Sequence, residues 1–289
     1  QNSSASCQAC APGKANPIPG SYDPADCRNC SAGFVAAASG AAFCDGCAAG
    51  TYQVGEGKRA CVACRPGSFC PAGASAALPC AEGSYSTSTS LTIVEECTPT
   101  GLGHYAPTGS TEQTKCSPGT AAPVASMGAC TKCAAGTYQA NEGQQACVAC
   151  KPGSFCPEGA SAALPCSEGS HSDATNLTTD AECTPTAKGH YAPTGSTRQT
   201  ACSPGTVAPN ASMATCVRCA AGKYQAGEGK QACVACEPGC YCPEGASAAL
   251  PCQEGSYSIS TNLTSTDECT ETDVGHSAPT GSTDQAPCV

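Results

Sequence analysis

The sequence of 289 residues has no tryptophan, 4 phenylalanines and 9 tyrosines. Much of its 40% apolar fraction is alanine and cysteine, whose side chains bury little surface each. Only 12% of the residues are charged, and no apolar run reaches the ~18 residues that a membrane-spanning helix needs. These absences exclude a large hydrophobic core, and we expect no direct insertion into a membrane.

Positive charge is also scarce. Lys and Arg together number 13 against 23 acidic residues, which gives a net charge of −10. Because an acidic surface repels the phosphates of nucleic acids, we expect no nucleic acid among the partners. We interpret the charge as a solvated surface that keeps the protein in solution.

Cysteine, glycine and proline are the residues that the sequence has in excess. It contains 29 Cys, 32 Gly and 23 Pro, a composition typical of small modules in which disulfides replace a core. Disulfides persist in oxidising compartments, so we predict a secreted, extracellular protein on a cell surface or surface appendage. No signal peptide precedes Gln1, and we expect a processed amino terminus.

One stretch recurs three times. CVACKPGSFCPEGASAALPC runs from Cys147 to Cys166, and close copies occupy 61–80 and 233–252, each 86 residues from the next. Such a period indicates tandem repeats. We predict a partial cysteine-rich unit at 1–30 and three repeats at 31–116, 117–202 and 203–289.

Each repeat contains a finer unit that begins Cys-x-x-Gly-x and often continues with an aromatic residue. In the second repeat these units are predicted to start at Cys133, Cys150, Cys166, Cys183 and Cys202. Such short steps leave no room for a helix and its connection, and Gly and Pro interrupt every helical pattern. The predicted fold class is small and disulfide-rich, mostly irregular or β: an elongated tandem array of short β-hairpin ribbons without a large hydrophobic core.

Hairpin geometry narrows the cysteine pairing, although spacing alone leaves many pairings open. The predicted clamps at hairpin bases are Cys10–Cys27, Cys30–Cys44, Cys47–Cys61, Cys116–Cys130, Cys133–Cys147, Cys202–Cys216 and Cys219–Cys233. Elsewhere we predict interlocked pairs: Cys64–Cys80 with Cys70–Cys97, Cys150–Cys166 with Cys156–Cys183, and Cys236–Cys252 with Cys242–Cys269. Each closed loop of about 15 residues contributes roughly 3 kcal/mol by constraining the unfolded chain.

Cys7, Cys240 and Cys288 have no partner in this scheme. Cys288 occupies the position of Cys116 and Cys202, so one hypothesis is that it bonds to Cys7 of another copy. Such a contact does not close on itself and would make a head-to-tail homopolymer. The alternative is that the 289 residues are cut from a longer chain whose neighbours supply both partners.

Cys240 replaces the serine found at positions 68 and 154. An odd cysteine in a secreted protein suggests intermolecular pairing or a free thiol. Lateral cross-linking between copies is one interpretation, and an unpaired, partly buried thiol is the one that we favour.

Several positions suggest covalent glycans. The N-glycosylation candidates are Asn2, Asn176, Asn210 and Asn262, each in an Asn-x-Ser/Thr sequon. Asn29 is a weaker candidate, because Cys30 inside its sequon is expected to be bridged. The O-glycosylation candidates are Thr108, Thr194 and Thr280, which lie beside proline in Ala-Pro-Thr-Gly-Ser loops.

The sequence gives little sign of catalysis or of a metal. A zinc ribbon is conceivable for the Cys-x-x-Cys pairs 44/47 and 61/64, but the pattern continues into single cysteines that a tetrahedral site would not use. His104, His190 and His276 repeat at one position, whereas an active site needs unlike groups that converge. We expect no cofactor, no metal and no enzymatic activity.

Cys-x-x-Cys followed by PGSFCPEGASAALPC and then by EGSYS resembles the ephrin-receptor-like cysteine-rich repeat family, which is similar in style to the disulfide ribbons of tumour-necrosis-factor receptors. The resemblance extends from about Cys7 to Cys288. Such repeats occur in receptor ectodomains and in large surface proteins of protists and algae. The resemblance therefore implies extracellular display, disulfide ribbons and contacts with proteins.

Two functional hypotheses follow. The first is a structural protein, a glycosylated subunit of a filament, flagellar appendage or surface coat that binds copies of itself head to tail. Near-identical repeats favour it, because a polymer uses the same interface again and again. The second is a receptor or surface-antigen ectodomain that binds a protein ligand, for which one repeat should diverge in exposed aromatic or Arg residues.

Overall fold

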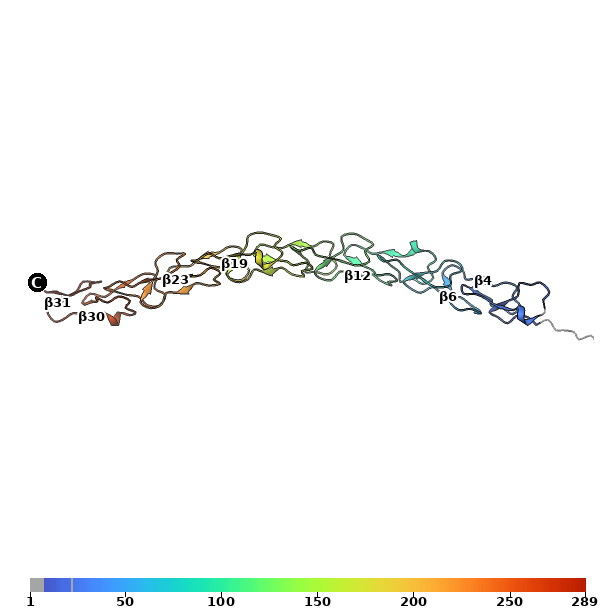
Figure 1. Ribbon diagram of the computed structural model, residues 1–289, viewed down its shortest axis with the longest axis horizontal. Helices are drawn as coiled ribbons and strands as arrows, with labels where there is room; N and C mark the ends of the chain where they lie inside the picture. Colours follow the sequence, from blue (N-terminus) through green and yellow to red (C-terminus); the bar gives the residue numbers. More distant parts are fainter. Residues whose placement is uncertain (1–7, 22) are drawn as a thin grey trace, which may run out of the picture. The chain divides into compact units, whose positions relative to one another are not determined.

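The computed structural model describes residues 8–21 and 23–289, so Cys7 and the sequon of Asn2 lie outside the described part. The chain divides into two compact units, Gln1–Cys133 with Gln139–Cys147 and Ala134–Tyr138 with Val148–Val289. Figure 1 shows that within each unit short hairpins follow one another in chain order.

All strands are two residues long and pair with a neighbour in the chain as antiparallel hairpins. In the first unit the hairpins are β1 (Lys14–Ala15) with β2 (Arg28–Asn29), β3 (Phe34–Val35) with β4 (Asp45–Gly46), β5 (Thr51–Tyr52) with β6 (Val62–Ala63), β7 (Ser68–Phe69) with β8 (Leu78–Pro79), β9 (Ser84–Tyr85) with β10 (Thr98–Pro99), β11 (His104–Tyr105) with β12 (Thr114–Lys115), and β13 (Thr120–Ala121) with β14 (Thr131–Lys132). Two short 3₁₀ turns, η1 (Pro24–Asp26) and η2 (Val94–Glu96), lie in the longer hairpin loops.

The second unit repeats the arrangement. Its hairpins are β15 (Thr137–Tyr138) with β16 (Val148–Ala149), β17 (Ser154–Phe155) with β18 (Leu164–Pro165), β19 (Ser170–His171) with β20 (Thr184–Pro185), β21 (His190–Tyr191) with β22 (Thr200–Ala201), β23 (Thr206–Val207) with β24 (Val217–Arg218), β25 (Lys223–Tyr224) with β26 (Val234–Ala235), β27 (Cys240–Tyr241) with β28 (Leu250–Pro251), β29 (Ser256–Tyr257) with β30 (Thr270–Glu271), and β31 (His276–Ser277) with β32 (Ala286–Pro287). Its 3₁₀ turns are η3 (Asp180–Glu182) and η4 (Thr266–Glu268). The predicted class of small, disulfide-rich β-hairpin repeats is confirmed.

The commonest kind of hairpin is illustrated by β5–β6. Cys47 directly follows the last strand of the preceding hairpin. We call the residue at this position the opening residue of a hairpin. The residue directly before the second strand, here Cys61, is the closing residue. A disulfide joins the two, with 5.7 Å between their Cα atoms. The loop between β5 and β6 is thereby held at both ends.

A glycine turn separates the opening residue from the first strand, as at Gly67 ahead of β7. Gly67 has φ +72°, and its carbonyl oxygen accepts a hydrogen bond from the Cys80 N–H at 2.9 Å. Its own N–H donates to the Ser86 carbonyl of the next hairpin at 2.8 Å. A Cβ atom at this position would lie 2.3 Å from the Gly109 carbonyl oxygen. Glycine is therefore required both by the backbone angle and by the close approach of a later hairpin.

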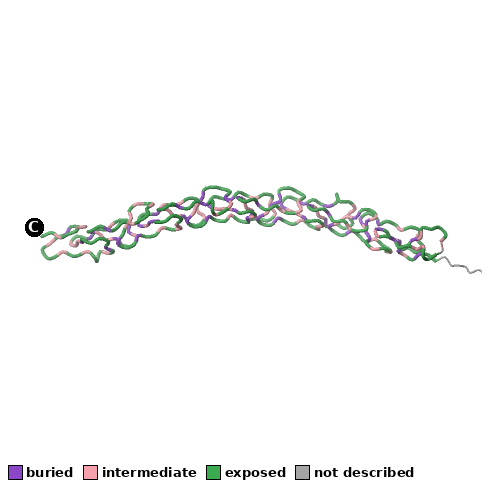
Figure 2. The backbone as a smooth tube through the Cα atoms, viewed as in Figure 1, coloured by how far each residue is buried: buried purple, intermediate pink, exposed green. Residues whose placement is uncertain are grey.

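Burial is distributed over many small clusters. Figure 2 shows buried residues in short groups that recur along each unit. A typical cluster contains the Cys64 and Cys70 half-cystines, Tyr52 and Ala74, with Ala77 packed against it. Backbone bridges such as Phe69 with Leu91 link consecutive hairpins. Disulfides, rather than a continuous apolar core, therefore hold each hairpin together.

Thirteen disulfides join the described cysteines, and seven of them are pairs that the sequence predicted. These are Cys10–Cys27, Cys30–Cys44, Cys47–Cys61, Cys116–Cys130, Cys133–Cys147, Cys202–Cys216 and Cys219–Cys233. Each joins an opening residue to its closing residue.

The six interlocked pairs are wrong. Instead of Cys64–Cys80 with Cys70–Cys97, Cys150–Cys166 with Cys156–Cys183, and Cys236–Cys252 with Cys242–Cys269, the structure has Cys64–Cys70, Cys80–Cys97, Cys150–Cys156, Cys166–Cys183, Cys236–Cys242 and Cys252–Cys269.

The closing residue explains the difference. In hairpin β7–β8 the closing position holds Ala77, so the opening Cys64 bonds to Cys70 directly after β7. Cys80 lies after β8 and opens the next hairpin, whose closing residue is Cys97. Cys80 is thus committed to the hairpin that follows it and is not available to Cys64.

A third kind of hairpin has no disulfide. Thr100 opens β11–β12 and is almost fully buried, at 1% exposure, whereas the closing residue Gln113 accepts a hydrogen bond from the Gly101 N–H at 2.8 Å. The same pair recurs as Thr186 with Gln199 and as Thr272 with Gln285. The predicted unit start at Cys183 is therefore wrong, because Thr186 opens that hairpin.

We expect Thr100→Cys with Gln113→Cys to form an additional disulfide, because every opening cysteine with a closing cysteine is bonded. The added loop would contribute about 3 kcal/mol, reduced by loss of the hydrogen bond that the Thr100 hydroxyl accepts from the Met127 N–H. Thiol titration and cystine peptide mapping measure the result, with Thr100→Cys alone as the control. Two reactive thiols in the double variant beyond those of the unmutated protein, which has Cys240 and Cys288 free, would contradict the geometry.

Substituting two glycines that have the same φ distinguishes the cost of backbone strain from the cost of steric contact. Gly67 and Gly73 both have φ +72°, but a Cβ on Gly73 meets nothing within 4 Å. We expect Gly73→Ala to cost about 1–2 kcal/mol from the left-handed angle alone. Gly67→Ala should cost about 1–3 kcal/mol more through overpacking against Gly109. Hydrogen exchange of peptides spanning 64–110 measures both, and equal protection in the two variants would refute the contact.

Candidate functional site

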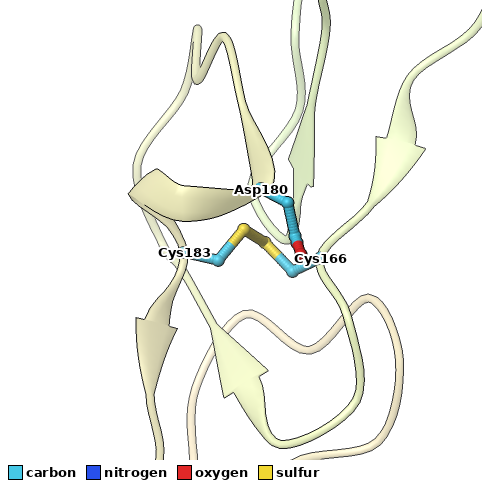
Figure 3. Close-up of side chains that lie close together, drawn as sticks. All are labelled: Cys166, Asp180 and Cys183. Atoms are coloured by element: carbon cyan, nitrogen blue, oxygen red, sulfur yellow. A yellow bond between two sulfur atoms is a disulfide. The ribbon is translucent and has the colours of Figure 1, made fainter.

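The closest group of metal-type ligands in the described residues is Cys166, Asp180 and Cys183, shown in Figure 3. The two sulfurs are bonded to each other, so neither is available as a thiolate. The Asp180 carboxylate accepts hydrogen bonds from the Ser167 hydroxyl at 2.5 Å and the Ser167 N–H at 2.9 Å. These bonds, the hydroxyl first, lower the pKa of Asp180. The group therefore fastens the η3 turn to the preceding strand connection.

The cysteines with zinc-ribbon spacing also lie in disulfides. Cys47 and Cys61 are bonded to each other, while Cys44 is bonded to Cys30 and Cys64 to Cys70. Because a zinc ligand must be a free thiolate, these four sulfurs do not form the tetrahedral set that their spacing resembles.

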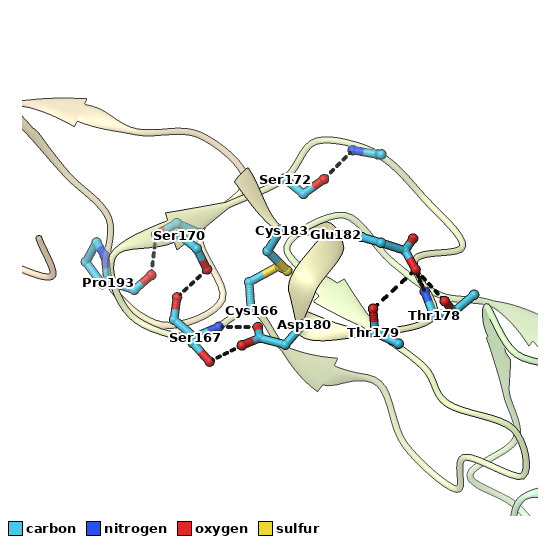
Figure 4. Close-up of a disulfide and its surroundings, with 12 residues drawn as sticks. Cys166, Ser167, Ser170, Ser172, Thr178, Thr179, Asp180, Glu182, Cys183 and Pro193 are labelled. Carbon is cyan, nitrogen blue, oxygen red and sulfur yellow. Dashed lines mark hydrogen bonds between the residues drawn. A yellow bond between two sulfur atoms is a disulfide. The ribbon is translucent and has the colours of Figure 1, made fainter. Parts of the chain in front are cut away.

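The loop between β19 and η3 carries the first Asn-Leu-Thr sequon, and Figure 4 shows its hydrogen bonds. Asn176 is exposed and has φ +62°, in the left-handed region that asparagine tolerates better than most residues. Leu177 points inward and is 8% exposed, next to Cys166 and Cys183. The Thr178 hydroxyl donates to the Glu182 carboxylate, which lowers the pKa of Glu182. Along the loop, Asn176 is exposed, Leu177 is buried and the Thr178 hydroxyl is hydrogen-bonded.

The corresponding loops of the other repeats have the same backbone. Asn262 has φ +63° and Ser90 has φ +65°. Thr264 bonds to Glu268, and Thr92 bonds to Glu96, whose pKa is lowered first by the Thr92 N–H and then by its hydroxyl. Asparagine at this position is therefore compatible with the loop, and serine serves equally well there.

The other predicted glycan positions differ in their surroundings. Asn210 is exposed two residues before Ser212, which has φ +58°. Asn29 lies in β2, is followed by the buried Cys30, and its Cγ would be 3.3 Å from a Cβ on Gly57. Asn29 itself is exposed, but the middle residue of its sequon is bridged.

Thr108, Thr194 and Thr280 are exposed in tight turns. In the first of these turns the Ser110 N–H and hydroxyl both donate to the Pro107 carbonyl, and Gly109 has φ +77°. The hydroxyl of Ser110 is therefore engaged by the turn, whereas Thr108 extends from its surface. Their O-glycosylation remains a prediction.

Two described cysteines are free, Cys240 and Cys288. Cys240 is half-buried in β27 and packs against a cluster that contains the Cys236 and Cys242 half-cystines. Burial, and then the charge of Glu237, raise the pKa of the Cys240 thiol, which reduces its nucleophilic fraction. Cys288 is exposed and follows β32 in the opening position. Cys7, its predicted partner, is outside the described residues.

The repeated histidines occupy turns. The Nδ1 atoms of His104 and His190 lie 2.9 Å and 3.3 Å from the carbonyl oxygens of Leu102 and Lys188. Among the described residues, the buried Nδ1 atoms of His171 and His276 have no hydrogen-bond partner. Each histidine sits in its own hairpin, at the start or end of a two-residue strand, so the structure does not bring them together.

Residues 119–176 match the family model described as tyrosine-protein kinase ephrin type A/B receptor-like, which is a receptor-like cysteine-rich domain rather than an enzyme family. No curated protein matches the chain. In the part of the chain that the structure describes, no helix is long and apolar enough to cross a membrane. The family match and the tandem disulfides indicate an extracellular or surface role. The chain consists of tandem cysteine-rich repeats, and its residues 119–176 are similar to the ephrin-receptor-like family.

Proposed function

We propose that this chain is a structural extracellular protein, the subunit of a filament, appendage or surface coat that assembles head to tail. The observation that carries the proposal is one contact made repeatedly: a glycine of one hairpin against a carbonyl of a later one. A Cβ built on Gly83 or Gly169 would lie 2.0 Å or 2.2 Å from the carbonyl oxygen of Ser126 or Ser212. Uniform contacts of this kind suit a polymer better than a receptor with one specialised face.

Charge supports a second copy as the partner. Glu254, Asp267 and Glu271 line a surface hollow in the last repeat. The hairpin β1–β2 exposes Lys14 and Arg28. Attraction between these opposite charges would favour contact between copies and would make that contact sensitive to salt.

Cys288 supplies the covalent part of the proposal. It holds the position of Cys116 and Cys202, which bond to Cys130 and Cys216. In the assembled state Cys288 would bond to Cys7 of the next copy, continuing the series of disulfides.

A receptor or surface-antigen ectodomain is the second candidate, favoured by the receptor-like description of the matching family. The third repeat differs from the first two at β27, where Cys240–Tyr241 replaces Ser-Phe, and a receptor would use this difference to bind its ligand. In that case a protein ligand, not another copy, would contact the third repeat.

We expect the protein, purified under oxidising conditions, to give a series of multimers on non-reducing electrophoresis that collapses to one band on reduction. Mass spectrometry should find a peptide that joins Cys288 to Cys7. Cys288→Ser should abolish the multimers, whereas Cys240→Ser is the matched control and should leave them unchanged. Monomers alone, or Cys288 bonded within its own polypeptide, would count against the covalent polymer.

A further inference from the structure

We propose that Asn176 and Asn262 carry N-linked glycans and that this loop position is a modification site built into the repeat. The proposal goes beyond the structural function and holds for either candidate function. It depends on the direction of the side chain, the fixation of the backbone and the contrast with another sequon.

The backbone at both asparagines is held while the side chain is free to project. The Asn176 N–H donates to the Cys150 carbonyl at 3.1 Å, and the Asn262 N–H donates to the Cys236 carbonyl at 3.0 Å. The Asn176 carbonyl faces Gly136, where a Cβ would come within 2.6 Å of its oxygen. Both acceptor carbonyls belong to half-cystines, so the loop is anchored to the disulfide framework.

The leucine that follows each asparagine is buried. Leu177 and Leu263 are 8% and 6% exposed and fix the loop to the interior. Because the leucine points inward and the chain at the preceding asparagine is left-handed, the carboxamide is directed to solvent, and both asparagines are exposed. Asn262 Nδ2 makes a 3.3 Å contact with the neighbouring exposed Thr261 hydroxyl. A sugar on either Nδ2 atom therefore displaces no packed residue.

Asn29 has a different setting. It is exposed, but it lies in β2, which pairs with β1, and Cys30 within its sequon is buried in a disulfide. The structure thus separates two sequons in anchored, left-handed loops from one in a paired strand whose middle residue is bridged.

The chemistry requires a lipid-diphosphate-linked oligosaccharide as the donor and an oligosaccharyltransferase. The amide nitrogen Nδ2 forms a bond to the anomeric carbon of the first sugar while the bond from that carbon to the diphosphate oxygen breaks. The lipid diphosphate leaves with the bonding electron pair, and Nδ2 gives up one proton to a base. No atom of the loop backbone takes part.

Ser90 provides a matched gain-of-site variant. It has the same left-handed backbone as Asn176 and Asn262 and is followed by Leu91 and Thr92. Ser90→Asn therefore creates the same Asn-Leu-Thr loop in the first repeat. The reverse changes, Asn176→Ser and Asn262→Ser, install a residue that the fold already accepts there.

The experiment uses the full chain secreted from a eukaryotic cell line that glycosylates a co-expressed reporter protein. Peptide mass spectrometry before and after N-glycosidase treatment reads each sequon, because enzymatic removal leaves aspartate. We expect glycans at Asn176 and Asn262 and none at Asn29. Each asparagine-to-serine variant should lose one glycan, and Ser90→Asn should gain one.

The opposite results overturn the proposal. Unmodified Asn176 or Asn262 beside a glycosylated reporter would refute a repeat-wide acceptor site, as would an unmodified Ser90→Asn variant. A glycan at Asn29 would refute the argument from its paired strand and bridged Cys30. Cystine peptides from each variant verify that the disulfides are unchanged, and enzymatic removal of the glycan from the unmutated protein gives the same loss independently of any substitution.

Discussion

The disulfide made by the opening residue of most hairpins is the constraint on which the remaining structure depends. A two-residue strand pair buries too little apolar surface to offset the entropy lost on ordering its loop. A disulfide across a loop of about 15 residues contributes about 3 kcal/mol by restricting the unfolded chain. Where the disulfide is missing, as at Thr100 and Gln113, side-chain hydrogen bonds take its place. Each hairpin is thus stabilised locally.

Contacts between hairpins follow from the same geometry. Once a disulfide fixes the loop, the glycine turn at its base lies at a defined place, and a carbonyl of a later hairpin packs on it. Because the contact is backbone on backbone, most side chains are free to vary, whereas a Cβ at the glycine is not tolerated. The repeats therefore keep glycines such as Gly67 and Gly153 while their exposed residues differ.

Much of the fold could be predicted from the sequence, because cysteine density and period leave few alternatives. The wrong pair Cys64–Cys80 treats Cys80 as the cysteine that closes the hairpin opened by Cys64, whereas Cys80 opens the next hairpin. In Cys61-Val-Ala-Cys64 the two central residues are the second strand β6, so the first cysteine closes one hairpin and the second opens the next. Ala77-Leu-Pro-Cys80 is the same segment with alanine at the closing position. Aligning these four-residue segments would have predicted the pairing, whereas aligning the cysteines alone does not.

The candidate glycan sites were visible as sequons, and the expected bridge at Cys30 already set Asn29 below Asn176. The left-handed backbone at Asn176 and its anchoring to the Cys150 carbonyl could not be read from the sequence, because they depend on a contact between residues that are far apart in the chain. The predictions about Cys7 and Asn2 lie outside the described residues.

The three kinds of hairpin recur in a fixed order, and this order defines the repeat. Within a repeat, closing positions hold cysteine, cysteine, alanine, cysteine and glutamine at 44, 61, 77, 97 and 113, and the same order follows at 130, 147, 163, 183 and 199. Because each hairpin contacts only the next one or two along the chain, stability is approximately additive and repeats can be gained or lost as wholes. The left-handed loop that holds Ser90, Asn176 or Asn262 precedes the fourth of these closing positions, so a group attached to the asparagines recurs at the spacing of the repeat. The disulfide pattern therefore sets the spacing of such groups on the surface of the protein.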